Sequence, residues 1–330
     1  MLHDLLLLIG GLVLIIKGGD LFVAAAIRIA EFLRMPRVVI GSTLVSLATT
    51  TPELVVSVMS GIKGEPGLAV GNAVGSVICN IGLILGIAAA IKHVDIHLRA
   101  LRTSLLAMFG AGILLFLMTL ELRLVRWQGV ILLIMGTVYF VWNFWENWRD
   151  RKPEDLAEAQ AIEAGVTTTR FAWLKSKPGS LVQFLAGALI VIVGSHFLVD
   201  GAINTATRLG VPSIILGLTV VAIGTSLPEL VTAITSSRKS VSDLAVGNVL
   251  GANIANLTLI VGIAAVVQNV PLDRKTQLLN FPAMLIMMGL LLWMLLTDRK
   301  ITQREGLVLI GTYIIYLALV AFESLPHAVR

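Results

Sequence analysis

The sequence predicts an all-α integral membrane protein whose ten transmembrane helices form two inverted five-helix repeats. Three observations predict this class. Of the 330 residues, 57% are hydrophobic and only 14% are charged, with a mean hydropathy of +0.91, which is not the balance of a soluble domain. Ten apolar segments have the length of about 20 residues that crosses the hydrocarbon core of a bilayer. The second half of the chain also repeats the first.

The first of these segments opens near the start of the chain without a basic region or a small-residue cleavage site, so we expect a helix and not a removed signal peptide. The predicted spans are residues 4–30, 37–60, 68–91, 101–119, 125–145, 180–207, 212–236, 243–267, 277–296 and 304–323.

The repeat is visible at an offset of 176 residues, which carries Pro52 onto Pro228 and Glu53 onto Glu229. GLAVGNAVGSVICNIGLILG (67–86) then matches DLAVGNVLGANIANLTLIVG (243–262) without a gap. The repeated motifs cover 41–86 and 217–262, within halves 1–145 and 180–330. Because each half has an odd number of spans, the second half enters the membrane from the opposite side. Inverted repeats of this kind are typical of secondary transporters.

The basic residues predict the orientation. If the loops alternate sides, sixteen basic residues fall on one side and seven on the other. The positive-inside rule then places both termini outside the inner (cell) membrane and the 146–179 loop in the cytoplasm. The net charge of +5 lies in these short loops, so we expect membrane lipid and no nucleic acid as partner.

Each repeat carries one carboxylate, Glu53 or Glu229, in an apolar span directly after a proline. A carboxylate at membrane depth costs about 3 kcal/mol or more. The proline removes the helical partner of a carbonyl group, and free carbonyls are tolerated in a bilayer where they line a cavity. Hydroxyl groups lie four and three residues before each carboxylate, and we expect them on the same helix face as that carboxylate. They belong to Thr49, Thr50, Thr225 and Ser226. Such hard oxygens suit sodium, calcium or magnesium. The alternative is that Glu53 is protonated and only braces two helices.

Amides and hydroxyls continue the pattern in the next span of each repeat. Asn80 and Asn256 are predicted to project toward the carboxylates as ligands. For Asn72 and Asn248, bridging between helices is an equal alternative. In the first span, Lys17 and Asp20 are three residues apart, which favours a local ion pair over a gating role.

The chain has no Walker loop, no CxxC motif and no HExxH motif. We therefore expect that it is not an enzyme and binds no cofactor. Transport would then depend on an ion gradient, with the first and sixth spans as the expected moving pair. A proton/calcium antiporter, a channel and a non-transporting membrane scaffold remain alternatives.

GSTLVSLATTTPE with GNAVGSVICN, and GLTVVAIGTSLPE with GNVLGANIAN, resemble the two repeats of the sodium/calcium exchanger family, within the cation/calcium antiporter superfamily, in its prokaryotic ten-helix members. The resemblance implies electrogenic exchange of several sodium ions for one calcium ion. We expect the transport unit to be a monomer. The implied ligands are side chains of Glu53, Glu229, Thr49, Thr50, Thr225, Ser226, Ser76 and Asn80, with main-chain oxygens of Ser46, Thr49, Ala222 and Thr225.

Two residues depart from the family pattern. Many members have Ser and Asp where this chain has Ala252 and Asn256. The site would then hold two carboxylates, which neutralise one calcium ion or leave three sodium ions with one charge in excess. An Asn at 256 resembles the potassium-independent exchangers of the superfamily, so we expect no requirement for potassium.

Overall fold

The computed structural model describes residues 2–62, 67–95, 98–149, 176–208, 224, 226–298 and 300–324. These residues are almost entirely helical, as predicted. Eight of the described helical segments are long and apolar enough to cross a membrane. The second predicted span is instead a chain of short helices. The seventh lies partly at 209–223 and 225, outside the described residues.

The first half begins with one long helix, α1 (Leu2–Leu33). The second span consists of α2 (Arg37–Ile40), the π-helix η1 (Gly41–Val45), α3 (Ser46–Thr49) and α4 (Thr51–Ile62). The third consists of α5 (Gly67–Cys79), the π-helix η2 (Asn80–Leu85) and α6 (Gly86–Ile91). Strand β1 (Val94–Asp95), helix α7 (Leu98–Met118), strand β2 (Arg123–Leu124) and helix α8 (Arg126–Arg149) complete this half.

The second half follows the same order. It contains α10 (Lys177–Arg208), α13 (Leu227–Arg238), α14 (Ser242–Ala255), the π-helix η5 (Asn256–Ile260), α15 (Val261–Val267), β3 (Val270–Pro271), the π-helix η6 (Thr276–Asn280), α16 (Phe281–Asp298), β4 (Lys300–Ile301) and α17 (Gln303–Ser324). The π-helices η2 and η5 begin at residues related by the 176-residue offset.

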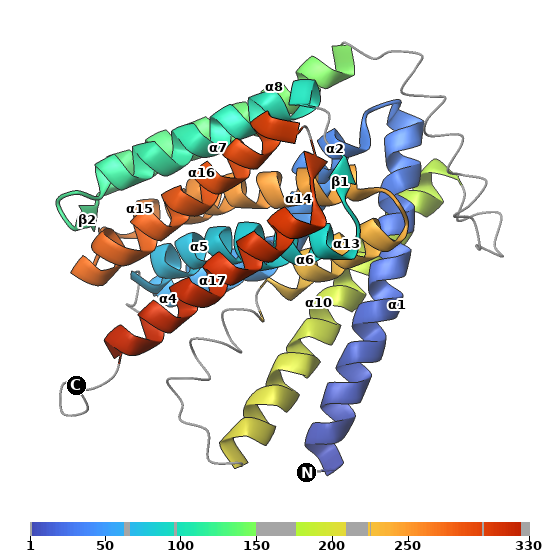
Figure 1. Cartoon of the computed structure of the whole chain (residues 1–330), viewed down its shortest axis with the longest axis horizontal. Coiled ribbons are helices and arrows are strands. Elements are labelled where there is room, and N and C mark those ends of the chain that lie inside the picture. The colour runs from blue at the N-terminus through green and yellow to red at the C-terminus, as the bar shows by residue number, and fades with distance from the viewer. Residues whose placement is uncertain are drawn as a thin grey trace.

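Two small antiparallel sheets show that the halves are inverted. Strand β1 pairs with β4, and β2 pairs with β3, so each sheet joins one half to the other. The two sheets lie at opposite ends of the helix bundle (Figure 1). Because β1 and β3 occupy equivalent positions in the two repeats, equivalent loops emerge at opposite ends. That arrangement is what a two-fold axis in the membrane plane requires.

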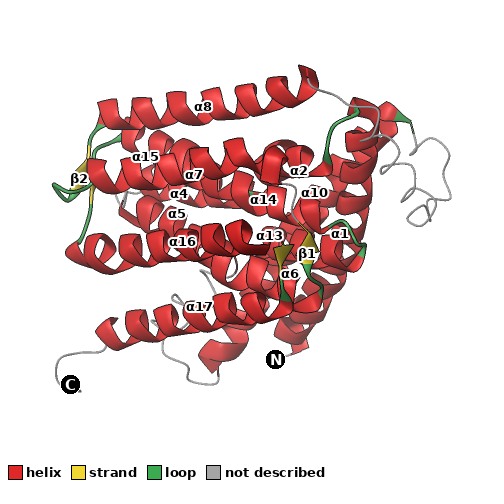
Figure 2. Ribbon diagram, turned by 45° about the horizontal axis from the view of Figure 1, so that its top comes forward, coloured by secondary structure: helices red, strands yellow, loops and turns green. Residues whose placement is uncertain are grey.

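The repeated motif helices form the centre of the molecule. In the segments Ala69–Ile91 and Ser242–Val267, 72% and 83% of the most apolar window is buried, against 22–39% in the other long spans. The helices α7, α8, α16 and α17 lie around this centre (Figure 2). The polar residues of the repeats are therefore held among protein side chains and away from lipid.

Helices α1 and α10 form a separate pair that crosses the other helices at a steep angle (Figure 1). Glycines recur every seven residues along the contact, a spacing that keeps them on one face. They are Gly11 and Gly18 on α1, and Gly187, Gly194 and Gly201 on α10. A Cβ atom on Gly11 would lie 2.7 Å from the backbone nitrogen of Leu198, so the backbones touch.

Polar contacts join the same pair near both ends. Asp4 of α1 forms an ion pair with Arg208 of α10, with Oδ2 and Nε 3.1 Å apart. At the other end, Arg28 donates hydrogen bonds to Ser180 Oγ (3.2 Å) and to Gln183 Oε1 (2.7 Å). Since these contacts and the glycine contacts extend over the whole length, α1 and α10 form one rigid unit.

The predicted local pair of Lys17 and Asp20 is wrong. Asp20 pairs with Lys239, in the turn after α13, with Oδ1 and Nζ 3.2 Å apart. The Lys239 ammonium also donates to the main-chain carbonyl of Asp20 at 3.2 Å, and Lys17 is exposed. Spacing along one helix indicated a shared face, but the neighbouring helix end supplies the partner. This ion pair joins the α1–α10 pair to the central helices.

The glycine contact predicts a difference between two adjacent substitutions. Gly11→Ala places a Cβ atom against backbone that cannot move aside, whereas a Cβ on Gly10 meets nothing within 4 Å. Both changes gain about 1 kcal/mol of helix propensity, so their difference isolates the packing. We expect Gly11→Ala to be less stable than Gly10→Ala by about 1–3 kcal/mol, measured by thermal unfolding in detergent. Equal stabilities would contradict the close contact.

Candidate ion-binding site

Both repeats break their helix at equivalent residues, Thr50 and Ser226. Their backbone angles are φ −79°, ψ 2° and φ −93°, ψ 10°, in the bridge region near the end of a helix. A new helix starts one residue later, with Pro52 or Pro228 as its second residue, where a missing N–H group leaves no hydrogen bond unmade. The prolines therefore begin α4 and α13 within the apolar segments.

The breaks place Glu53 and Glu229 in the first turns of α4 and α13. Both residues are 0% exposed. The positive end of a helix dipole stabilises a carboxylate in this position by about 0.3–1 kcal/mol, far less than burial costs it. The two groups are close enough for their charges to interact. Two carboxyl groups are thus brought together in a dry interior.

Hydroxyl groups and carboxylates are in contact across the two repeats. Ser226 donates to Glu53 Oε1 across the repeats at 3.4 Å, and its Oγ lies 3.5 Å from Ser76 Oγ. The Thr49 hydroxyl is in turn a neighbour of Glu229. The helix face predicted to be shared by Ser226 and Glu229 stays a prediction, because Ser226 lies directly before the first residue of α13 and its hydroxyl contacts Glu53 and Ser76. A hydroxyl group of each half therefore lies beside the carboxylate of the other half.

Thr49 and Thr50 also anchor the first break. The Thr50 hydroxyl donates to the Ser46 carbonyl oxygen at 2.7 Å, and Thr49 Oγ1 lies 3.3 Å from the same oxygen and 3.1 Å from Asn248 Oδ1. The contact of Asn248 with Thr49 favours the bridging interpretation of this amide. A cation at the Ser46 carbonyl would have to displace one of these donors, because a carbonyl oxygen has two lone pairs.

The two predicted amide ligands, Asn80 and Asn256, are both 0% exposed and each begins a π-helix. Turns of this kind are frequent at functional sites. Asn80 Nδ2 donates to Oδ1 of Asn253 at 3.0 Å. Asn253 was not predicted as a site residue. Its position in an apolar span, three residues before Asn256, is the feature of the sequence that could have indicated it. The predicted main-chain ligands at Ala222 and Thr225 lie outside the described residues.

Several buried oxygen atoms at this centre accept no hydrogen bond from the described residues. They are Glu53 Oε2, both carboxylate oxygens of Glu229, Asn80 Oδ1 and Asn256 Oδ1. Buried polar groups are normally satisfied, and an isolated buried charge is especially costly. Carboxylate and amide oxygens are ligands for hard cations such as Na⁺ and Ca²⁺. The residues present therefore fit a dehydrated cation.

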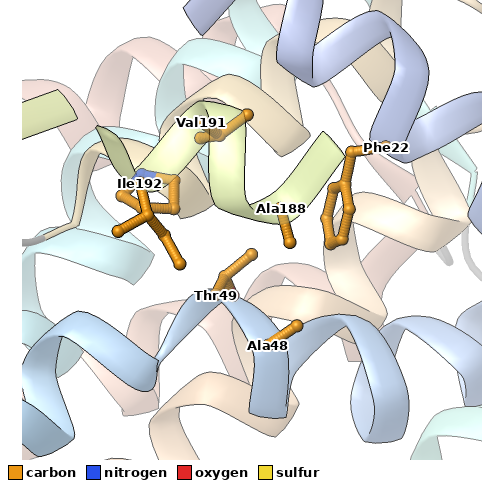
Figure 3. A pocket seen from close by; sticks show the side chains of 7 residues that line it. Phe22, Ala48, Thr49, Ala188, Val191 and Ile192 are labelled. Atoms are coloured by element: carbon orange, nitrogen blue, oxygen red, sulfur yellow. The ribbon is translucent and has the colours of Figure 1, made fainter. Parts of the chain in front are cut away.

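An apolar recess separates the α1–α10 pair from the two helix breaks (Figure 3). The recess is shallow and too narrow to admit a water molecule. Its lining residues are Phe22, Ala48, Thr49, Ala188, Val191, Ile192 and Pro228. Apart from Thr49 these side chains are apolar, so the surface on which the pair rests offers few directional bonds.

An inverted repeat with broken helices and buried carboxylates at its centre defines a membrane transporter for cations. A family profile described as sodium/calcium exchanger protein matches residues 3–145 and 179–322. The chain belongs to this family, whose members are transporters of Na⁺ and Ca²⁺ and not enzymes. The resemblance carried by the two motifs is thereby confirmed.

Relatives match along almost the whole chain. The inner membrane protein YrbG of Escherichia coli is 33% identical, over 96% of this chain and 97% of its own. The sodium/calcium exchanger MaX1 of Methanosarcina acetivorans is 29% identical, over 97% and 99%. The solved structure of the sodium-calcium exchanger NCX_Mj, soaked without Na⁺ and Ca²⁺, has a TM-score of 0.81 at 28% identity, over 97% and 99%.

The unsatisfied carboxylates predict stabilisation by bound cations. Calcium at about 100 times its dissociation constant should stabilise the native protein by about 2.7 kcal/mol and raise its melting temperature. We expect Glu53→Gln and Glu229→Gln to lose most of this increase, because an amide brings no charge to the ion. Glu146→Gln, on α8, is the control and should keep it. Equal increases in all four proteins would contradict a site at these carboxylates.

Proposed function

We propose that the chain exchanges Na⁺ for Ca²⁺ across the cell membrane by alternating access, with net movement of charge and without a need for K⁺. The proposal rests above all on Glu53 and Glu229, which are buried together and keep unsatisfied oxygens at the centre of an inverted repeat. The relatives named as sodium/calcium exchangers support the choice of ions.

Charge balance explains the coupling. With two carboxylates, one Ca²⁺ neutralises the site, and several Na⁺ ions compete for the same oxygens. An empty site carries two buried negative charges and is too costly to move across the membrane interior. Only states with bound ions then reorient. Movement of Ca²⁺ in one direction therefore requires movement of Na⁺ in the other. Three Na⁺ against one Ca²⁺ would move one net charge per cycle.

The proposed ligands follow the two breaks. Glu53 and Glu229 supply charge, and the neutral oxygens come from Thr49, Thr50, Thr225, Ser226, Ser76, Asn80, Asn256 and the carbonyls of Ser46 and Ala222. Asn256 replaces a third carboxylate that many family members have, and Ala252 replaces a hydroxyl. A site with fewer charges needs fewer cations, which supports exchange without K⁺.

The α1–α10 pair is the proposed moving part. Its two helices are in contact along their length, and it faces the breaks across an apolar recess. The Asp20–Lys239 ion pair would have to break, or move with the pair, when it slides. The halves 1–145 and 180–330, joined by a cytoplasmic segment at 146–179, would present the site to opposite sides in turn, with both termini outside. Since both halves of one chain supply the contacts at the site, a monomer is a sufficient transport unit.

The proposal predicts loss of transport on removal of one charge. In inside-out vesicles, Glu229→Gln should abolish Na⁺-driven uptake of calcium-45 while the protein still folds, whereas Glu146→Gln should transport normally. Unchanged uptake by Glu229→Gln would refute the assignment. Uptake that follows a pH gradient and ignores sodium would identify proton exchange instead. Flux far faster than a turnover cycle, without counter-transport, would identify a channel.

The charge and potassium claims have their own measurement. In proteoliposomes free of K⁺, a Na⁺ gradient should drive calcium uptake at the same rate as with K⁺ present. The same gradient should produce a transient current on a supported membrane, because each cycle moves net charge. Uptake that requires K⁺, or uptake without current, would contradict this part of the proposal and leave Na⁺/Ca²⁺ exchange itself standing.

A further inference from the structure

We infer that Asn253 is a positioning residue: its hydrogen bond fixes the Asn80 amide so that the carbonyl oxygen, and not the NH₂ group, faces the transported cation. The inference rests on the proposed function, since it deepens the role of one proposed ligand. An amide that ligates a cation must present oxygen, because its NH₂ group carries partial positive charge. Side-chain amides rotate, so something must choose the orientation.

A chain of contacts between three helices makes that choice. Asn253 of α14 accepts a hydrogen bond from Asn80 Nδ2 at 3.0 Å. The Asn253 Nδ2 atom donates to the sulfur of Met108, on α7, at 3.6 Å. All three side chains are 0% exposed, so no solvent competes for these groups.

The sulfur atom of Met108 determines how the two amides are oriented. A thioether accepts hydrogen bonds weakly and donates none. Asn253 therefore turns its NH₂ group to Met108 and its oxygen to Asn80. Asn80 must then present its own NH₂ group to Asn253, because two amide oxygens 3.0 Å apart would repel each other. The reverse arrangement of both amides would leave the Asn253 oxygen facing sulfur without a donor.

The remaining atom, Asn80 Oδ1, is buried and has no hydrogen-bond partner among the described residues. Asn80 follows Ser76 by one helical turn, which places both on one face. Ser76 in turn contacts Ser226, the residue that donates to Glu53. The amide oxygen thus belongs to the same cluster as the carboxylates, and its lone pairs remain for a cation.

The second repeat lacks this device. The residue equivalent to Asn253 is Val77, although Met284 is present where the first repeat has Met108. Both Nδ2 and Oδ1 of Asn256 are buried without a partner among the described residues. Only one of the two amides in the site is therefore held in place. The chain itself also shows that valine is tolerated at this position of the repeat.

A double-mutant cycle tests the inference. Asn253→Val removes the orienting hydrogen bond and should raise the KM for Ca²⁺ about tenfold, with kcat little changed. A tenfold loss of affinity corresponds to about 1.4 kcal/mol of binding free energy. Asn80→Asp provides oxygen in both orientations of the side chain. In an Asn80→Asp background, Asn253→Val should therefore change the KM less than about twofold, because no amide remains to be oriented.

The calcium-dependent rise in melting temperature, measured on the same four proteins without any gradient, provides a second readout. If wild-type protein shows no Na⁺-driven uptake, the proposed function fails, and this thermal series still tests the orientation. If wild-type protein transports but Asn253→Val keeps the wild-type KM and thermal shift, the inference fails alone. An equal penalty in both backgrounds would show a structural role and also overturn it.

If Asn253→Val does not fold, Met108→Leu replaces it. This change keeps the volume and removes the sulfur acceptor that fixes the direction. It should raise the KM for Ca²⁺ by several-fold in the Asn80 protein and leave the Asn80→Asp protein unchanged. If the KM for Ca²⁺ stays unchanged in both backgrounds, the role of this series of contacts is overturned.

Discussion

Two carboxyl groups buried close together are the constraint on which the rest of this structure depends. Glu53 and Glu229 have no exposure, and three of their four oxygens have no hydrogen-bond partner among the described residues. One hydroxyl bond at 3.4 Å and the ends of two helix dipoles offset little of the cost of burial. A bound cation would offset this cost at the proposed site, and the same deficit would make movement of an empty, charged site unfavourable.

The inverted repeat supplies the means to expose this site on either side. Contacts of the same kind occur twice with opposite direction, as in the breaks at Thr50 and Ser226 and the sheets at the two ends of the bundle. Two conformations built from equivalent contacts have similar energies, so ion binding can shift the balance between them. The α1–α10 pair contributes no residue to either break; it faces them across an apolar recess, and the Asp20–Lys239 ion pair joins it to the central helices.

Much of the fold followed from the sequence because hydrophobic length and an internal repeat are properties of the chain alone. The carboxylates were recognisable since no packing role repeats a Pro-Glu pair at membrane depth. Partners between distant segments were not predictable. Lys17 and Asp20 had helical spacing, yet Asp20 pairs with Lys239, a residue 219 positions away. Ser226 likewise bonds to the carboxylate of the other repeat, a contact that spacing along the chain does not reveal.

The asymmetry of the amides has a consequence for a site that must bind two kinds of ion. Ca²⁺ and Na⁺ both take oxygen ligands, but a carrier must accept them in different numbers at the same carboxylates. Asn80 has Asn253 as a hydrogen-bond partner, whereas the Asn256 amide has none among the described residues, so we expect the Asn256 side chain to reorient more readily. A fixed oxygen lowers the entropic cost of binding each ion, and an adjustable one accommodates the change of load. A strictly symmetric site would have to give up one of these properties. The difference between Val77 and Asn253 is thus one point at which the inverted copies have diverged in chemistry while keeping the same backbone.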